Sequence, residues 1–211
     1  MTGKGPDVFS DIADRYDRVN RILSLGRDRA WRQRALEFLP QGRVLDLGAG
    51  TGAVNVDMGE RTLIAADPSL PMLSRNDSPA RLAAFGEGLP LADSVLDGVF
   101  SAFVFRNLTS VPETLAEIHR VLRPGASAVI VDLTRPIGKM KQRLHRMGSA
   151  VFVPLVGRLA GAPSEYKYLN VSLDKLPSPE LLFAEGPLAL DHTWRMGPLG
   201  FVYGAVLKRG L

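Results

Sequence analysis

Cysteine is absent from the 211 residues of this sequence. Its absence excludes a disulfide framework, a thiolate metal site and a cysteine nucleophile. Histidine is scarce as well, because only three occur, at positions 119, 145 and 192, and they are too scattered to suggest a metal cluster. We therefore expect no metal centre, and the lack of cysteine permits a cytoplasmic location.

Long hydrophobic runs are absent too. No stretch reaches the roughly 18 apolar residues that a membrane-spanning helix requires. The nearest candidate, residues 147–162, is interrupted by Pro154 and Arg158. The first seven residues lack the apolar core of a signal peptide. We expect a cytoplasmic protein that is either soluble or bound peripherally to a membrane.

The overall composition is ordinary. Hydrophobic residues make up 45% of the chain and charged residues 23%, which excludes a disordered, collagenous or coiled-coil protein. A chain of this length typically forms one domain, so we expect a single domain over residues 1–211. The net charge of +4 suits several kinds of anionic partner, and no motif indicates nucleic acid. We expect no nucleic-acid partner. Whether the chain forms a homo-oligomer is left open by the sequence.

Short apolar runs alternate with helical periodicity along the chain. Residues 7–38 predict two or three short helices, which form an N-terminal cap over residues 1–40, and residues 111–122 predict another helix. The expected strands are residues 44–47, 62–66, 81–85, 96–105, 126–133, 188–196 and 201–208. This order predicts an α/β fold, a doubly wound and mainly parallel sheet with helices on both faces that ends in an antiparallel hairpin.

The strongest local signal is a glycine-rich loop in residues 44–53, VLDLGAGTGA. Gly48 and Gly50 let backbone N–H groups approach a ligand closely where a strand turns into a helix. Asp46 is a poor neighbour for a pyrophosphate but favours a ligand that carries an ammonium and a sulfonium. Asp67, 19 residues after Gly48, ends the next strand, where an acid accepts hydrogen bonds from both ribose hydroxyls. These residues predict a nucleoside pocket for S-adenosylmethionine.

A nicotinamide-dependent oxidoreductase is a rival interpretation, because the glycines alone also satisfy the dinucleotide pattern. Asp46 disfavours it. The chain length disfavours it as well, since only about 160 residues follow the loop, too few for a second mononucleotide-binding half and a substrate domain.

Other motifs are more particular than the glycine loop. They are Tyr16-Asp17 followed by Asn20, the pair Trp31-Arg32, the run Arg106-Asn107-Leu108-Thr109, and Tyr166 followed by Tyr168-Leu169 and Ser172. With these motifs the chain resembles the ubiquinone/menaquinone biosynthesis C-methyltransferases, which are class I S-adenosylmethionine-dependent enzymes, over nearly its whole length. The resemblance implies a seven-stranded Rossmann-like methyltransferase sheet.

The resemblance also implies the activity, which is C-methylation of a prenylated quinol precursor, with demethylmenaquinol to menaquinol as the leading case. S-adenosylmethionine is the implied methyl donor and S-adenosylhomocysteine the product. The expected cofactor-binding residues are Tyr16, Asp46, Gly48, Gly50, Thr51, Asp67, Pro68, Met72, Gly86, Glu87 and Ala102. Tyr166 and Tyr168 are expected to line the quinol site, within a substrate-side insertion over residues 135–175.

Three residues are candidates for the chemistry. Arg106 and Asn107 end the fourth expected strand, at the edge where open α/β sheets place ligands. A guanidinium and an amide there could stabilise phenolate charge on the quinol. Asp132 closes the fifth strand and is a candidate base, directly or through water.

Four positions depart from the family pattern. Ala53 and Phe85 stand where the family has polar side chains, Ala102 replaces a frequent serine, and Val104 replaces a glycine. Two alternatives therefore stay open: a methyltransferase of the same fold that acts on another small molecule, and an accessory protein that binds S-adenosylmethionine without catalysis.

Residues 135–162 suggest contact with a membrane. The stretch from 133 to 164 contains six cations and no acid, and residues 147–156 are mostly apolar. A polyprenyl quinol must be met at the bilayer, and a basic segment next to an apolar one suits an anionic membrane surface. The alternative is a helix with a solvated basic face that covers the sheet, followed by an apolar loop in the core.

Overall fold

The computed structural model describes residues 21–159, 173 and 176–211. One sheet contains all seven strands, in the order β3-β2-β1-β4-β5-β7-β6. The strands are β1 (Arg43–Leu47), β2 (Thr62–Ala66), β3 (Ala80–Leu82), β4 (Leu96–Ala102), β5 (Leu122–Leu133), β6 (Ala189–Met196) and β7 (Val202–Lys208). The helices are α3 (Asp28–Leu36), α4 (Leu70–Leu73), α5 (Val111–Val121), α6 (Lys139–Leu159) and α8 (Pro179–Leu182), with short 3-10 turns η1 (Asn55–Asp57), η2 (Phe105–Asn107) and η3 (Pro198–Gly200).

The sheet topology confirms the predicted fold. Strands β1 to β5 pair in parallel, whereas β7 pairs antiparallel with both β5 and β6. The last strand in the sequence thus lies inside the sheet. Arg209, just after β7, donates hydrogen bonds to the Leu122 carbonyl and to Ser94 Oγ, which ties this end of the chain to the start of β5.

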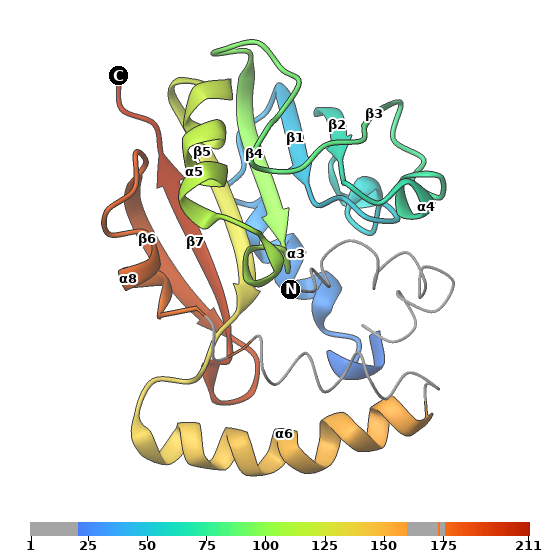
Figure 1. The fold of residues 1–211 in the computed structure, drawn as a ribbon, viewed down its shortest axis with the longest axis vertical. Coiled ribbons are helices and arrows are strands. Elements are labelled where there is room, and N and C mark those ends of the chain that lie inside the picture. The colour runs from blue at the N-terminus through green and yellow to red at the C-terminus, as the bar shows by residue number, and fades with distance from the viewer. Residues whose placement is uncertain (1–20, 160–172, 174–175) are drawn as a thin grey trace.

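The two faces of the sheet carry separate hydrophobic clusters, because neighbouring residues of a strand point to opposite sides. Leu45 packs in the cluster that α5 covers, and Val44 packs in the cluster that α3 covers. Figure 1 shows α5 in front of the sheet and α3 behind it. Both central residues are fully buried, so the parallel strands are apolar on both sides, as expected for a doubly wound sheet.

Four local features differ from the sequence prediction. β3 is shorter than expected, and β4 ends at Ala102 instead of continuing to residue 105. Phe103 has a left-handed backbone conformation (φ +66°), which breaks the extended geometry although the apolar pattern continues. The connection from β1 to β2 contains only the three-residue turn η1 where a doubly wound sheet usually has a helix. The apolar residues after 146 continue the helix α6 and do not form a loop.

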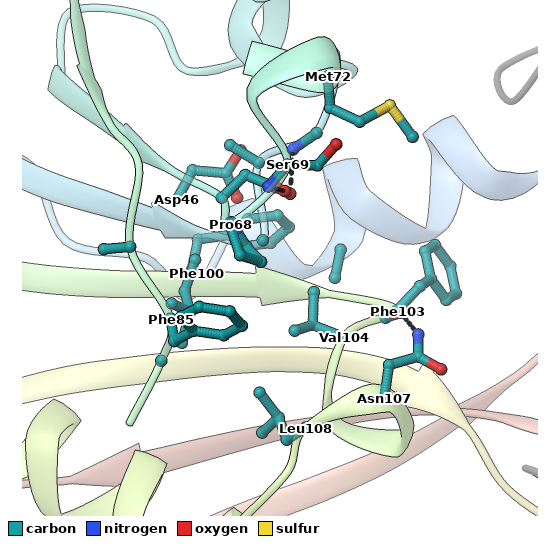
Figure 2. Close-up of a pocket in the computed structure, with 18 of the residues that line it drawn as sticks. Asp46, Pro68, Ser69, Met72, Phe85, Phe100, Phe103, Val104, Asn107 and Leu108 are labelled. Carbon is teal, nitrogen blue, oxygen red and sulfur yellow. Dashed lines mark hydrogen bonds between the residues drawn. The ribbon is translucent and has the colours of Figure 1, made fainter. Parts of the chain in front are cut away.

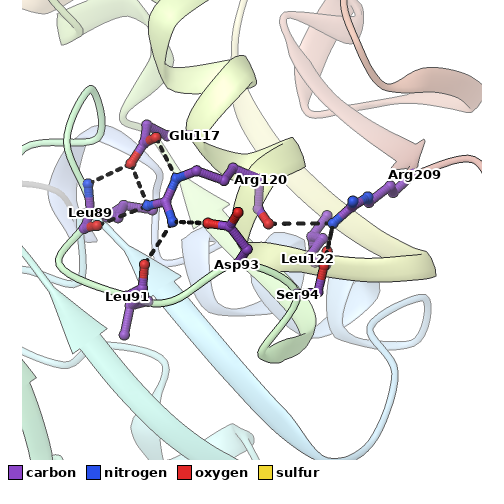
Figure 3. Close-up of polar contacts among 8 residues, drawn as sticks. All are labelled: Leu89, Leu91, Asp93, Ser94, Glu117, Arg120, Leu122 and Arg209. Carbon is purple, nitrogen blue, oxygen red and sulfur yellow. Dashed lines mark hydrogen bonds and ion pairs between the residues drawn. The ribbon is translucent and has the colours of Figure 1, made fainter.

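A partly exposed arginine network fastens the connection before β4 to α5 (Figure 3). The Arg120 guanidinium donates hydrogen bonds to the Glu117 and Asp93 carboxylates and to the carbonyls of Leu89 and Leu91. Glu117 in turn accepts a hydrogen bond from the Leu89 amide at 2.8 Å. One helix side chain therefore satisfies several backbone groups of a loop that has no regular structure of its own.

Gly204 of β7 offers a test of the packing on the sheet. A Cβ at this position would overlap the ring of Trp194, its partner on β6. We expect Gly204→Ala to lower the free energy of unfolding by about 1–3 kcal/mol, the usual cost of overpacking, in urea titrations. Gly88→Ala is the matched control, because a Cβ there meets no atom within 4 Å. Equal effects of the two substitutions would contradict this account.

Candidate functional site

The glycine loop is held against the end of β2 by the backbone. The amides of Gly48 and Ala49 both donate to the Ala66 carbonyl, at 2.7 and 3.0 Å. Gly48 has a left-handed conformation (φ +74°), and a Cβ there would overlap the side chain of Val104. Only glycine fits both conditions, so the loop can lie directly between the ends of β2 and β4.

Asp67 connects the glycine loop to the segment after β2. Its carboxylate accepts hydrogen bonds from the Gly50 amide at 2.9 Å and from the Ser69 amide at 2.8 Å. Burial raises the pKa of Asp67, and these two backbone hydrogen bonds oppose that shift. Each carboxylate oxygen has two lone-pair sites, so both oxygens keep the capacity to accept a further hydrogen bond from a ligand. Asp67 lines the pocket at this edge of the sheet.

Asp46 lies deeper in the same pocket, with 3% of its surface exposed. Burial raises the pKa of Asp46 to about 7, the charge of Asp67 adds to this rise, and the Arg32 guanidinium opposes it. A cation that enters the pocket stabilises the ionised form of such a carboxyl group. The side chain is therefore suited to bind a positively charged group.

Arg32 brings a buried cation to the pocket from α3. It donates a hydrogen bond to Asp28 at 2.6 Å, and its guanidinium lies 5.2 Å from the centre of the Phe103 ring. Arg32 and Asp46 line one pocket, so a cation and a carboxyl group are presented together. This pair matches the two charges of an amino-acid zwitterion.

The rest of the pocket is largely apolar (Figure 2). Figure 2 shows Asp46, Ser69 and Met72 on one side, Asn107 and Leu108 on the other, and Phe85, Val104 and Phe103 between them. Phe85 is 53% exposed, which is unusual for a large aromatic side chain and leaves its ring free to contact a flat ligand.

Asn107 has an unsatisfied acceptor. Its amide nitrogen makes a long contact of 3.4 Å with the Phe103 carbonyl. Its buried Oδ1 has no hydrogen-bond partner among the residues that the structure describes. Buried polar atoms are normally paired, so an orphaned acceptor that lines a pocket points to a ligand donor.

Arg106 and Asp132 form a separate buried pair. The Arg106 guanidinium donates to the Asp132 carboxylate, which is fully buried and also accepts from the Arg106 amide at 3.2 Å and the Leu133 amide at 2.7 Å. Neither side chain belongs to the pocket lining. The pair fixes the turn η2 to the end of β5, directly beside Asn107.

Comparison with known proteins identifies the relatives of this chain. The model of the ubiE/COQ5 methyltransferase family matches residues 3–184. A demethylmenaquinone methyltransferase of Thermus thermophilus is 37% identical over 194 residues, covering 84% of this chain and 88% of that protein. A ubiquinone/menaquinone biosynthesis C-methyltransferase of Geobacter sulfurreducens is 33% identical over 201 residues, covering 85% and 78%.

The chain belongs to the ubiE/COQ5 methyltransferase family. Its fold agrees with that assignment. The crystal structure of a SAM-dependent methyltransferase from Thermotoga maritima superposes with a TM-score of 0.70 at 17% identity, covering 97% of this chain and 99% of that one. The resemblance read from the sequence motifs is thereby confirmed, and the chain is a methyltransferase, as predicted. Family and fold imply the use of S-adenosylmethionine.

The structure brings most of the predicted site residues together. The residues that line the pocket as expected are Asp46, Gly48, Gly50, Thr51, Asp67, Pro68, Met72, Gly86, Glu87, Ala102 and Asn107. Tyr16, Tyr166 and Tyr168 lie outside the described residues. Among the described residues, no group of three or more histidine, aspartate or glutamate side chains is arranged to hold a metal ion.

Sequence reasoning assigned no role to Arg32, Phe100 or Phe103, which also line the pocket. Arg32 is part of the Trp31-Arg32 pair that carries the resemblance, and Phe103 precedes the Arg106-Asn107 motif that also carries it. Phe100 and Phe103 are apolar residues of a strand and its end, where nothing in the pattern separates a pocket wall from the core.

The raised pKa of Asp46 predicts a pH dependence of ligand binding. The ammonium group of the ligand binds to the ionised carboxylate, so affinity for S-adenosylhomocysteine should rise with pH through about 7 and then level off. The dissociation constant at pH 6 should be about tenfold higher than at pH 8, since only about a tenth of the carboxyl groups are ionised at the lower pH. Calorimetry in two buffers of different ionisation enthalpy should detect proton release.

Asp46→Asn is the control for this prediction. The variant should bind more weakly at pH 8 and lose the change in affinity around pH 7. An unaltered pH profile in Asp46→Asn would assign the titration to another group, such as Asp67, whose pKa is also raised.

Proposed function

We propose that this pocket binds S-adenosylmethionine. When bound, this cofactor supplies a methyl group on an electrophilic sulfonium. Asp67, Phe85 and Leu108 line the pocket; Asp67 would accept hydrogen bonds from the ribose hydroxyls, and Phe85 and Leu108 would make apolar contact with the adenine. Asp46 and Arg32 would hold the ammonium and carboxylate of the methionine part. The observation that supports this assignment best is the combination of Asp46 and Asp67 around the glycine loop, because it suits a cationic nucleoside.

The proposed acceptor is the ring of a prenylated quinol, and the proposed reaction converts demethylmenaquinol to menaquinol. The support comes from family membership and from the relatives that carry the name demethylmenaquinone methyltransferase. The ring carbon must act as a nucleophile, so charge on the quinol oxygens has to be stabilised while the carbon–methyl bond forms. The ring proton is then lost to solvent, which restores aromaticity.

The described residues supply positioning more than acid–base chemistry. Asn107 lines the pocket with a free acceptor, so we propose that it orients a quinol hydroxyl and the nucleophilic carbon with it. Arg106 and Asp132 would act through Asn107, because their ion pair fixes the turn that carries it. Holding two reactants in line removes much of the barrier in a direct displacement.

We propose that the enzyme is a peripheral membrane protein on the cytoplasmic face of a membrane. A polyprenyl chain is strongly apolar, so the quinol partitions into the bilayer and has to be taken from there.

Binding and methyl-transfer assays test the proposed function. The purified protein should bind S-adenosylhomocysteine and not NAD in calorimetric titrations, and should transfer a labelled methyl group from S-adenosylmethionine to reduced demethylmenaquinone. Binding of S-adenosylhomocysteine without methyl transfer to any quinol would favour an accessory protein and overturn the proposed reaction. Binding of NAD alone would overturn the cofactor.

Asn107→Leu separates orientation of the quinol from binding of the cofactor. The variant keeps the branched shape and the number of heavy atoms of the side chain and removes the orphaned acceptor. We expect the methylation rate to fall by about 100-fold, the lower end of the range for loss of one aligned polar group, with unchanged affinity for S-adenosylhomocysteine. Thermal unfolding checks the fold of the variant. A loss of cofactor affinity equal to the loss of rate would place Asn107 in the cofactor site.

A further inference from the structure

Helix α6 exposes an apolar stripe. Met140 is 80% exposed, Leu144 55% and Met147 63%, and the spacing of four and three residues places these side chains on one face of the helix. Ile137, just before the helix, is 65% exposed and extends the stripe. The half-buried positions lie on the opposite face, and they are Gln142, His145 and Ser149. The helix therefore turns its polar side to the protein and its apolar side to solvent.

Cations flank this stripe on both sides. At 100° per residue, Lys139 and Arg143 lie along one border of the stripe and Lys141 lies along the other. All three are exposed, and no acid occurs anywhere between residues 133 and 164. An exposed apolar face bordered by cations is the pattern of a helix that lies in a membrane interface.

The placement of α6 in the fold relates this surface to the site. Figure 1 shows α6 beyond the carboxyl ends of β4 and β5. The glycine loop, Asp67 and Asn107 all lie at the carboxyl ends of parallel strands, so the pocket opens at this same edge of the sheet. A flat surface that contacts the outer face of α6 therefore lies on the same side of the molecule as the sheet edge that carries the pocket (Figure 1).

We propose that the outer face of α6 docks in the plane of an anionic lipid bilayer. The apolar stripe would enter the boundary between headgroups and acyl chains, while Lys139, Lys141 and Arg143 contact lipid phosphates. No helix in the described part of the chain is long and apolar enough to cross a membrane, which fits docking in the plane. A second copy of this surface is a poor partner, because its cations would meet cations. The proposal rests on the proposed function, since the enzyme has to reach a quinol that is dissolved in the bilayer.

Vesicle co-sedimentation tests this docking surface. The full chain should sediment with vesicles of phosphatidylcholine and phosphatidylglycerol, weakly with phosphatidylcholine alone, and less as salt is added. The triple variant Lys139→Gln, Lys141→Gln and Arg143→Gln should bind about 100-fold more weakly, because each cation near an anionic surface contributes about 1 kcal/mol. The triple variant Met140→Ser, Leu144→Ser and Met147→Ser should lower binding at least tenfold, both at low salt and at high salt.

A matched control removes the same charge elsewhere. Arg34→Gln, Arg43→Gln and Lys208→Gln change exposed cations at or near the opposite edge of the sheet, so this variant should sediment like the wild type. Equal sedimentation of the wild type and both α6 variants, or no sedimentation at all, would overturn the proposal. So would a dimer of the wild type that the serine variant abolishes, because the stripe would then bind a second copy.

The absence of cysteine allows a direct measurement of insertion. A Met140→Cys variant labelled with a polarity-sensitive dye should shift to shorter emission wavelength with anionic vesicles, and a Val56→Cys variant, labelled at an exposed site on η1, should not. Equal shifts at the two positions would overturn the proposed orientation. Neither assay needs methyl transfer, so docking without activity on a quinol would refute the proposed function alone.

Discussion

The carbonyl oxygen of Ala66 holds the candidate site together. It accepts hydrogen bonds from the amides of Gly48 and Ala49, and Asp67, the next residue, accepts one from Gly50. Ala66, the last residue of β2, and Asp67, the residue after it, thereby fix the direction of the glycine loop. Because β1, β2 and β4 are parallel and in register, this single anchor also sets where Asp46 stands relative to the loop after β4. The pocket exists because these strand ends share one edge.

Two pairs of opposite charges lie near that edge, and they differ in what satisfies them. Asp132 accepts three hydrogen bonds from the protein, including one from the Arg106 guanidinium, so its charge is fully compensated inside the fold. Asp46 is also buried, and burial raises its pKa because the Arg32 guanidinium opposes this shift only in part. A compensated pair stiffens a turn, whereas an undercompensated acid is ready to receive a cationic ligand.

Sequence patterns predicted the strands and the glycine loop well, because both depend on local composition. The environment of Arg106 could not be predicted in this way. Its position at a strand end suggested a pocket residue, but the register of β4 with β5 brings Asp132, 26 residues away in sequence, within reach of its side chain. The left-handed turn at Phe103 likewise interrupts an unbroken apolar run. The outward stripe of α6 depends on which face of the helix the protein covers, and periodicity alone does not decide that.

The place of β7 has a consequence for synthesis of the chain. This strand is the last in the sequence, yet it fills the space between β5 and β6. Until residues 202–208 have left the ribosome, the outer edge of β5 has no partner, and an unpaired edge invites pairing with another chain. Arg209 then bonds to the Leu122 carbonyl and completes the closure. A truncation before Val202 therefore removes an interior strand and separates β6 from β5, whereas loss of an edge strand would leave the rest of the sheet continuous.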